Sequence, residues 1–330
     1  MPSSESVPRT DAPGECRAVV DIGTNSVKLL VARVDGFQVE PLLEKGNQTR
    51  LGEGFFATHR LQPAAIERTV RAVTAFRDEA IAFRPARFRV LATAAAREAE
   101  NRADLLEALA PVAGTSVEVI SGELEADLAF RGVCTLPGLG NHPLLVADVG
   151  GGSTELIVGQ SGRRRFGRSF PLGAVRLMET LRVPENPRPE DLDHCRQHLD
   201  AWVDREVRPG LRDALPRSFP DGRPGDGDLE FVGVGGTAAV LACMVLGLER
   251  FDRSRIEAAR LDPATLAHWT SRLWSLPLSE RRRIPGLPAE RADVILTGSA
   301  IYEALVRAFG LAWLRPSTRG LRFAALLDAR

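Results

Sequence analysis

The sequence predicts an α/β protein built from two related halves with a cleft between them. Apolar segments of strand-like composition alternate along the chain with segments of helical periodicity, which is the pattern of an α/β fold. The 330 residues exceed the size of one ordinary hydrophobic core. In addition, DIGTNSVKLLV at residues 21–31 aligns without a gap with DVGGGSTELIV at residues 148–158. Each copy follows an apolar strand and begins its own α/β unit, so we interpret the pair as a duplicated domain.

The first half is expected to cover residues 16–128, after a disordered polar tail at residues 1–15. Apolar runs on both sides of the first glycine turn have the composition of buried strands, and later segments alternate between helical and strand-like patterns. In chain order we expect strands at 16–20 and 27–34, a helix at 62–83, a strand at 87–91, a helix at 101–109, a strand at 116–120 and a helix from Ser121.

The second half is expected to cover residues 129–314, and residues 315–330 form a separate C-terminal segment. Turn-forming residues predict a surface loop at 218–228. In chain order we expect a strand at 144–147 that leads into the second motif, a helix at 189–207, a strand, glycine turn and buried helix over 229–247, a helix over 291–309 with a break near Thr297–Gly298, and a final short strand, turn and helix.

The composition argues against several classes of function. The formal net charge is zero, so bulk charge does not favour a nucleic-acid or membrane partner. No apolar run reaches the ~18 residues of a membrane span, and the N-terminus lacks a hydrophobic signal core. The four cysteines are scattered without a metal-binding or disulfide pattern. We therefore expect a cytoplasmic protein that needs no DNA, RNA or membrane as a partner.

Three glycine-rich turns are candidate anion-binding sites. The turn of the second motif is followed by a β-rich segment, whereas a Walker loop or a dinucleotide fingerprint leads into a helix. It is therefore a strand–turn–strand loop whose backbone N–H groups can point at an anion. A tight hairpin without a ligand explains one such turn equally well, but not the repetition. The candidate phosphate-binding residues of the three turns are Asn25, Ser26, Gly151, Gly152, Ser153, Thr154, Gly235, Gly236 and Thr237.

Carboxylates accompany the two duplicated turns. Asp21 and Asp148 stand where the preceding strands end, and Glu155 follows the second turn. A single aspartate before a glycine turn usually stabilises the turn, but the paired occurrence favours a function. Carboxylates beside phosphate oxygens would repel a substrate unless a cation lay between them, so the pattern predicts Mg²⁺ or another divalent cation. Facing turns with such a cation would clamp a phosphorylated ligand, as in actin-like phosphotransferases.

Other polar residues have weaker signals. Thr93 and Arg97 directly follow a predicted strand and are candidate phosphate ligands, although a surface arginine fits the sequence equally well. The acidic start of the helix from Ser121 needs no function, because acidic residues stabilise the first turn of a helix. Two arginine runs, Arg163–Arg165 and Arg281–Arg283, have the pattern of solvated segments and would matter only for a long polyanionic substrate.

Taken together, the motifs resemble the exopolyphosphatase / guanosine pentaphosphate phosphohydrolase (Ppx/GppA) family over about residues 17–328. The resemblance implies a duplicated actin-like (ribonuclease H-like) ATPase fold in which the C-terminal segment packs back on the first half. Leu124 and Ala324 depart from the family pattern, which has a second glutamate and a glycine there. The stretches that carry the resemblance are DIGTNSVKLLV, RLGEGF, LATAAAREAENR, VEVISGELEADLAFRGV, VADVGGGSTELIVG, FPLGAVRL, VGVGGTAAVLA and STRGLRFAALL.

The resemblance also implies a site and an activity. The family's Ser-Gly-x-x-Glu-Ala signature makes Glu125 the general base that activates water, with Arg97 and Glu155 as further catalytic residues. By the same resemblance Asp148 and Glu155 position Mg²⁺, and Asp21 is a further candidate ligand from its place in the repeated motif. The implied activity is Mg²⁺-dependent release of terminal orthophosphate from inorganic polyphosphate by a homodimer. The chain lacks room for the C-terminal HD-like domain of longer relatives, which leaves its processivity open.

Alternative functions remain at this point. The same hydrolysis could act on guanosine pentaphosphate, which would need a base-binding pocket that the sequence does not identify. A kinase of the actin-like fold would need a full adenosine pocket and an acceptor. A non-catalytic nucleotide sensor would bind phosphates and release nothing. Either hydrolase would release orthophosphate without an added acceptor, whereas the kinase and the sensor would not.

Overall fold

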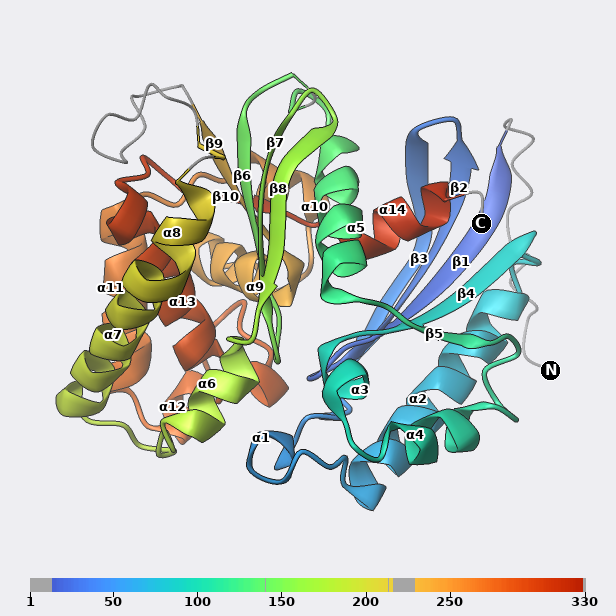
Figure 1. Cartoon of the computed structure of the whole chain (residues 1–330), viewed down its shortest axis with the longest axis horizontal. Helices are drawn as coiled ribbons and strands as arrows, with labels where there is room; N and C mark the ends of the chain where they lie inside the picture. Colours follow the sequence, from blue (N-terminus) through green and yellow to red (C-terminus); the bar gives the residue numbers. More distant parts are fainter. Residues whose placement is uncertain (1–13, 140, 213, 216–228, 329–330) are drawn as a thin grey trace.

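The computed structural model describes residues 14–139, 141–212, 214–215 and 229–328, and consists of two α/β halves side by side (Figure 1). The loop expected at 218–228 and residues 1–13 of the expected tail lie outside the described residues. Glu15, the last residue of the expected tail, belongs to the first strand. Within the described residues, no helix combines the length and the apolar character that a membrane span requires.

The first half is organised around a five-stranded sheet with the order β3-β2-β1-β4-β5. Its first three strands are antiparallel, and the last two run parallel to β1. Because β1 and β4 are parallel, the turn after β1 and the residues after β4 meet at one edge of the sheet. The strands are β1 (Glu15–Ile22), β2 (Val27–Asp35), β3 (Gln38–Asn47), β4 (Arg87–Ala92) and β5 (Val117–Val119).

The second half repeats this topology. Its strand order is β8-β7-β6-β9-β10, again with three antiparallel strands followed by two that are parallel to the central strand. The repeated strand order confirms the duplication and the α/β fold predicted from the two motifs. The strands are β6 (Leu144–Val149), β7 (Thr154–Gln160), β8 (Arg163–Phe170), β9 (Glu230–Val234) and β10 (Arg315–Ser317).

Two helices, α5 (Gly122–Cys134) and α14 (Leu321–Leu327), lie between the two sheets (Figure 1). Helix α5 packs on the second sheet and against α14, and α14 packs on β1 and β2 of the first sheet. Phe323 of α14 belongs to an apolar cluster with Val19 and Leu30. A domain boundary at 128/129 falls inside α5, and the division of the chain into domains stays a prediction.

The other helices belong to one half or the other. Those of the first half are α1 (Phe55–Thr58), α2 (Pro63–Ile81), α3 (Ala94–Glu98) and α4 (Arg102–Leu109). Those of the second half are α6 (Ala174–Thr180), α7 (Pro189–Trp202) with a π-helical continuation (Val203–Val207), α8 (Arg208–Leu211), α9 (Gly235–Leu246), α10 (Arg253–Ala258), α11 (Pro263–Ser275), α12 (Leu278–Arg281), a 3₁₀ turn (Ala289–Arg291) and α13 (Ile295–Phe309).

Three sequence-based expectations need correction. The break expected near Thr297–Gly298 is wrong, because α13 is continuous from Ile295. Gly298 instead permits close packing, since a Cβ there would lie 2.6 Å from the Thr237 methyl group. Strands β3 and β8 were not expected as such. Both are edge strands with largely polar side chains, and charged edge residues discourage pairing with other chains.

Arg281 contradicts the expectation of a solvated arginine run. Its side chain is completely buried, and its guanidinium donates hydrogen bonds of 2.7–2.9 Å to three carbonyl oxygens. These belong to Glu185, Leu276 and Ala292, which lie in three different segments of the second half. A buried cation is tolerated when its donors are satisfied. Arg281 is therefore a structural residue that ties these segments together.

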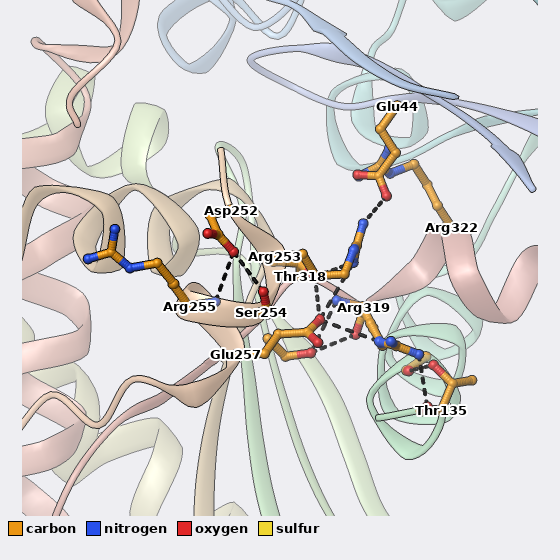
Figure 2. A network of polar contacts seen from close by, with 12 residues as sticks. Glu44, Thr135, Asp252, Arg253, Ser254, Arg255, Glu257, Thr318, Arg319 and Arg322 are labelled. Carbon is orange, nitrogen blue, oxygen red and sulfur yellow. Dashed lines mark hydrogen bonds and ion pairs between the residues drawn. The ribbon is translucent and has the colours of Figure 1, made fainter. Parts of the chain in front are cut away.

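The chain passes between the halves before α5 and again after β10, and the connection after β10 touches α5 itself. A Cβ on Gly132 of α5 would lie only 2.0 Å from the Gly320 carbonyl oxygen. Nearby, Arg319 donates to the Thr135 carbonyl at 3.0 Å. Figure 2 shows the polar network beside this contact, in which Arg253 of α10 pairs with Glu44 of β3. The network thus links the first sheet, α10 and the C-terminal connection.

We predict that Gly132→Ala lowers the free energy of unfolding by about 1–3 kcal/mol, because the added methyl group overpacks a backbone–backbone contact. Urea denaturation measures the change. Gly46→Ala is the matched control, since its Cβ would have only ordinary contacts of 3.9–4.0 Å. Equal effects of the two substitutions would contradict the importance of this contact.

Candidate functional site

A cavity of about 100 Å³ lies between the halves where β1 and β6 end. Most residues predicted from the sequence line it: Asp21, Asn25, Ser26, Thr93, Glu125, Asp148, Gly151, Gly152, Ser153, Glu155, Gly236 and Thr237. Three others do not. Arg97 and Gly235 line neighbouring cavities. Thr154 is buried and its hydroxyl donates to the Leu172 carbonyl at 2.5 Å, so this side chain stabilises the fold.

The two duplicated turns have the same geometry and touch each other. Gly23 N donates to Ser26 O, and Gly150 N donates to Ser153 O, both at 3.0 Å. A Cβ on Gly152 would lie 2.7 Å from the Thr24 hydroxyl oxygen of the other turn. The bare backbone is therefore required by the close approach of the two halves, and it leaves amide groups available for an anion.

The third turn contributes the N-terminus of α9. Gly235 has a φ of +83°, which favours glycine. The Thr237 hydroxyl donates to the Val149 carbonyl at 3.1 Å and thereby fixes the start of the helix against β6. Free N–H groups at the start of this 12-residue helix suit an anion.

Glu125 is held in the cavity by Arg97. Arg97 Nη1 donates to Glu125 Oε2 at 2.8 Å and to the Ile120 carbonyl at 3.1 Å. Burial raises the pKa of Glu125 to about 7, and the nearby Arg97 partly opposes that rise. A carboxyl group with this pKa can accept a proton near neutral pH and remain ionised often enough to act as a base.

The other carboxylates share the same buried environment. Burial raises the pKa of Asp148 to about 6, with Lys28 acting in the opposite direction. Burial also raises the pKa of Asp21. The Ser169 hydroxyl donates to Glu155 Oε1 at 2.6 Å, yet burial and the neighbouring acids keep the pKa of Glu155 well above its ordinary value. The cavity thus concentrates negative charge away from water.

Two cations in the cavity were missed from the sequence. Lys28 comes from β2, and Arg291 comes from the 3₁₀ turn before α13. Among the described residues, no carboxylate forms an ion pair with either side chain. The Arg291 guanidinium lies against the backbone of Gly236, where a Cβ would be 2.0 Å from Nη1. Lys28 belongs to the repeated motif and could have been noticed, whereas Arg291 has no local signal.

Polar contacts between α6 and the first half hold the cleft closed. Arg176 Nε donates to the Gly152 carbonyl at 2.7 Å, and its Nη2 contacts both carboxylate oxygens of Glu98 at 2.7–2.8 Å. One turn later, Glu179 accepts a hydrogen bond of 2.9 Å from Gly54 N. Helix α6 therefore connects the second glycine turn to the opposite half.

A divalent cation fits the donor set of the cavity. Asp21, Asp148 and Glu155 all line it, and Mg²⁺ prefers oxygen ligands. Among the described residues, no group of three or more His, Cys, Asp or Glu side chains is placed to hold a metal ion. Magnesium is usually held by one or two carboxylates together with substrate phosphates and water, and not by a cage made of protein ligands alone. The carboxylates of the cavity fit this mode of binding.

The fold and the cavity together define a class of protein. Two sheets of equivalent strand order lie on either side of a cavity lined by duplicated glycine turns, which is the arrangement of the actin-like α/β fold. Residues 30–329 match the family model described as the Ppx/GppA phosphatase family. The chain belongs to this family, as its motifs predicted.

Individual relatives support the assignment. The chain is 33% identical to exopolyphosphatase 2 of Mycobacterium tuberculosis over 301 residues, which cover 88% of this chain and 89% of the relative. It is similar to the Aquifex aeolicus PPX-GPPA enzyme structure, with a TM-score of 0.75, 29% identity and coverage of 96% and 99%. An exopolyphosphatase structure from Cytophaga hutchinsonii has the same fold, with a TM-score of 0.83 at 23% identity and coverage of 94% and 96%.

We predict that Glu98→Gln raises the KM of the enzyme about two- to fivefold with a smaller effect on kcat. It removes a partly exposed ion pair that closes the cleft, which is worth about 0.5–1 kcal/mol, and leaves the Arg176–Gly152 bond in place. Steady-state kinetics measure the change. Glu107→Gln, on the exposed surface of α4, is the control. An unchanged KM would show that this pair does not assist substrate closure.

Proposed function

We propose that the protein is a Mg²⁺-dependent exopolyphosphatase that releases terminal orthophosphate from inorganic polyphosphate. The observation that carries the proposal is the placement of Glu125, paired with Arg97, in one narrow cavity with two opposed phosphate turns. The exopolyphosphatase names of several relatives support it. The cavity of about 100 Å³ has room for the end of a phosphate chain, which fits removal of terminal groups.

In the proposed reaction, the turn amides together with Lys28 and Arg291 bind phosphate oxygens. Arg97 orients Glu125, and this carboxylate accepts a proton from the attacking water. The water oxygen forms a bond to the terminal phosphorus, the bridging P–O bond breaks, and the shortened chain leaves with the electron pair. When bound, Mg²⁺ would neutralise charge on the phosphate oxygens. Asp148 would hold it, together with Asp21 and Glu155, directly or through water.

A specific observation favours guanosine pentaphosphate as a second candidate substrate. A cavity of about 370 Å³ adjoins the 100 Å³ cavity between the glycine turns, which we call the phosphate cavity, and has a partly apolar wall. Phe251, whose side chain is 58% exposed, lies on this wall with Ala239 and Val240. An exposed aromatic ring beside apolar side chains can stack with a nucleobase. This cavity would serve as the base-binding pocket that the sequence did not identify.

Other properties belong to the proposal as well. We infer a homodimer in the cytoplasm that works without DNA, RNA or a membrane. The zero net charge and the family membership support these inferences. A kinase and a non-catalytic sensor stay alternatives, and both are separated from a hydrolase by the release of orthophosphate without an added acceptor.

We expect orthophosphate release from polyphosphate in the presence of Mg²⁺ and none after chelation of the metal. Release from guanosine pentaphosphate, measured in parallel, decides between the two substrates. Phe251→Ala should weaken only the nucleotide reaction, because polyphosphate has no base to stack. No release from either substrate would exclude a hydrolase.

Glu125→Gln should reduce kcat by roughly 10²–10⁴-fold, because the amide cannot accept the proton of the attacking water. Substrate binding, measured by titration calorimetry, should remain. Glu123→Gln is the matched control, two residues earlier on the same helix and exposed to solvent. Turnover near that of the unmodified protein would remove Glu125 from the role of base.

We expect kcat/KM to fall as the pH drops below about 7. The pKa of Glu125 is raised to about 7, so its carboxylate is available above that pH and becomes protonated below it. A pH–rate profile at saturating Mg²⁺ measures this fall in kcat/KM. The residual activity of Glu125→Gln should not show the same fall at low pH. A profile that stays flat from about pH 5.5 to 8 would contradict the assignment.

A further inference from the structure

A second cavity lies on the other side of the catalytic carboxylates. Its volume is about 380 Å³, and it is formed by α3, the start of α5 and the end of β8, with Arg97, Gly122 and Ser169 among its lining residues. We call it the outer chamber. None of its lining residues belongs to the lining of the phosphate cavity. The proposed reaction assigns it no role.

The wall between the outer chamber and the phosphate cavity is made partly of side chains. Arg97 lines the chamber and bonds to Glu125, which lines the cavity. Ser169 lines the chamber and bonds to Glu155, which also lines the cavity. Gly122 completes the wall, since a Cβ there would lie 2.6 Å from Ser169 Cβ and 3.7 Å from Arg97 Nη2. The Arg97 side chain therefore stands between the two spaces.

The substrate chain extends in a different direction. The phosphate cavity shares six lining residues with the 370 Å³ cavity beside Phe251, including Lys28 and Arg291, so the two are continuous. The remainder of a phosphate chain therefore leads toward these cations. In an in-line displacement the attacking water stands opposite the leaving chain. Glu125, the proposed base, stands beside the outer chamber, which agrees with this geometry.

We propose that the outer chamber is the exit site for the orthophosphate product and that Arg97 is its gate. The inference rests on the proposed hydrolysis. Once Glu125 has accepted the proton of the attacking water, its ion pair with Arg97 loses a charge and weakens. The guanidinium can then turn toward the newly formed phosphate anion. Product leaves on one side while the shortened chain stays bound on the other, so one binding event supports several cleavages.

The charges around the outer chamber suit a phosphate anion. Its two acidic lining residues already have partners, since Glu98 pairs with Arg176 at 2.7 Å and Glu123 with Arg164 at 3.4 Å. The chamber therefore presents no unpaired carboxylate to the departing anion. Arg97 reaches it from α3, and the first amides of α5 face the same region.

Filling the outer chamber tests the proposal. Gly167→Leu adds a side chain to its lining, where the nearest atom is Nη1 at the flexible end of Arg164. Arg165→Leu is the matched control, because it adds an apolar side chain at an exposed position of the same strand. Glu123→Trp is a second filling variant at an exposed position, in case Gly167→Leu does not fold.

Quenched-flow chemistry measures cleavage of polyphosphate, and a fluorescent phosphate sensor measures release during the same turnover. In the filling variants we expect cleavage at the unmodified rate and release slowed about tenfold, so that release limits turnover. Hydrolysis in ¹⁸O-water should incorporate more than one labelled oxygen per phosphate, because trapped product re-forms the anhydride bond repeatedly. Release that keeps pace with cleavage in both filling variants would overturn the exit route. Absence of cleavage in the unmodified protein would instead refute the proposed function.

Discussion

The burial of several carboxylates in one small cavity is the constraint on which the site depends. Glu125, Asp148 and Glu155 all have raised pKa values because the fold removes them from water. Their repulsion costs stability, and the structure offsets it with Arg97, Ser169 and the positive side chains of the cavity. Such an arrangement is unfavourable for an empty protein and favourable for one that binds a cation and a phosphate chain.

The two halves must fit closely to hold these charges together, and they must also be able to move apart. On one side, Gly132 of α5 allows the connection at Gly320 to pack directly against this helix. On the other side, side chains of α6 bridge the cleft, with Arg176 reaching both Glu98 and the second glycine turn. Partly exposed contacts of this kind each contribute little free energy.

The sequence was most informative where local pattern decides structure. The repeated motif predicted both central hairpins and the duplication, because apolar strands around glycine turns are a local signal. Edge strands β3 and β8 escaped prediction since most of their side chains are polar. Arg281 and Arg291 were misread or missed because their partners come from distant segments. Glu125 was found only through family resemblance, since its acidic helix start needs no function.

The duplicated scaffold carries unlike chemistry in its two halves. Lys28 pairs in register with Asp21, and at the equivalent place Glu155 pairs with Asp148. One copy of the motif therefore supplies a cation and the other an acid. Lys28 lies toward the 370 Å³ cavity beside Phe251, and Glu155 lies toward Glu125 and the outer chamber. An in-line displacement needs positive charge near the leaving chain and a base near the water. In the proposed reaction, divergence at this one register position of the repeat would supply that difference in charge and would give a symmetric fold a direction for its chemistry.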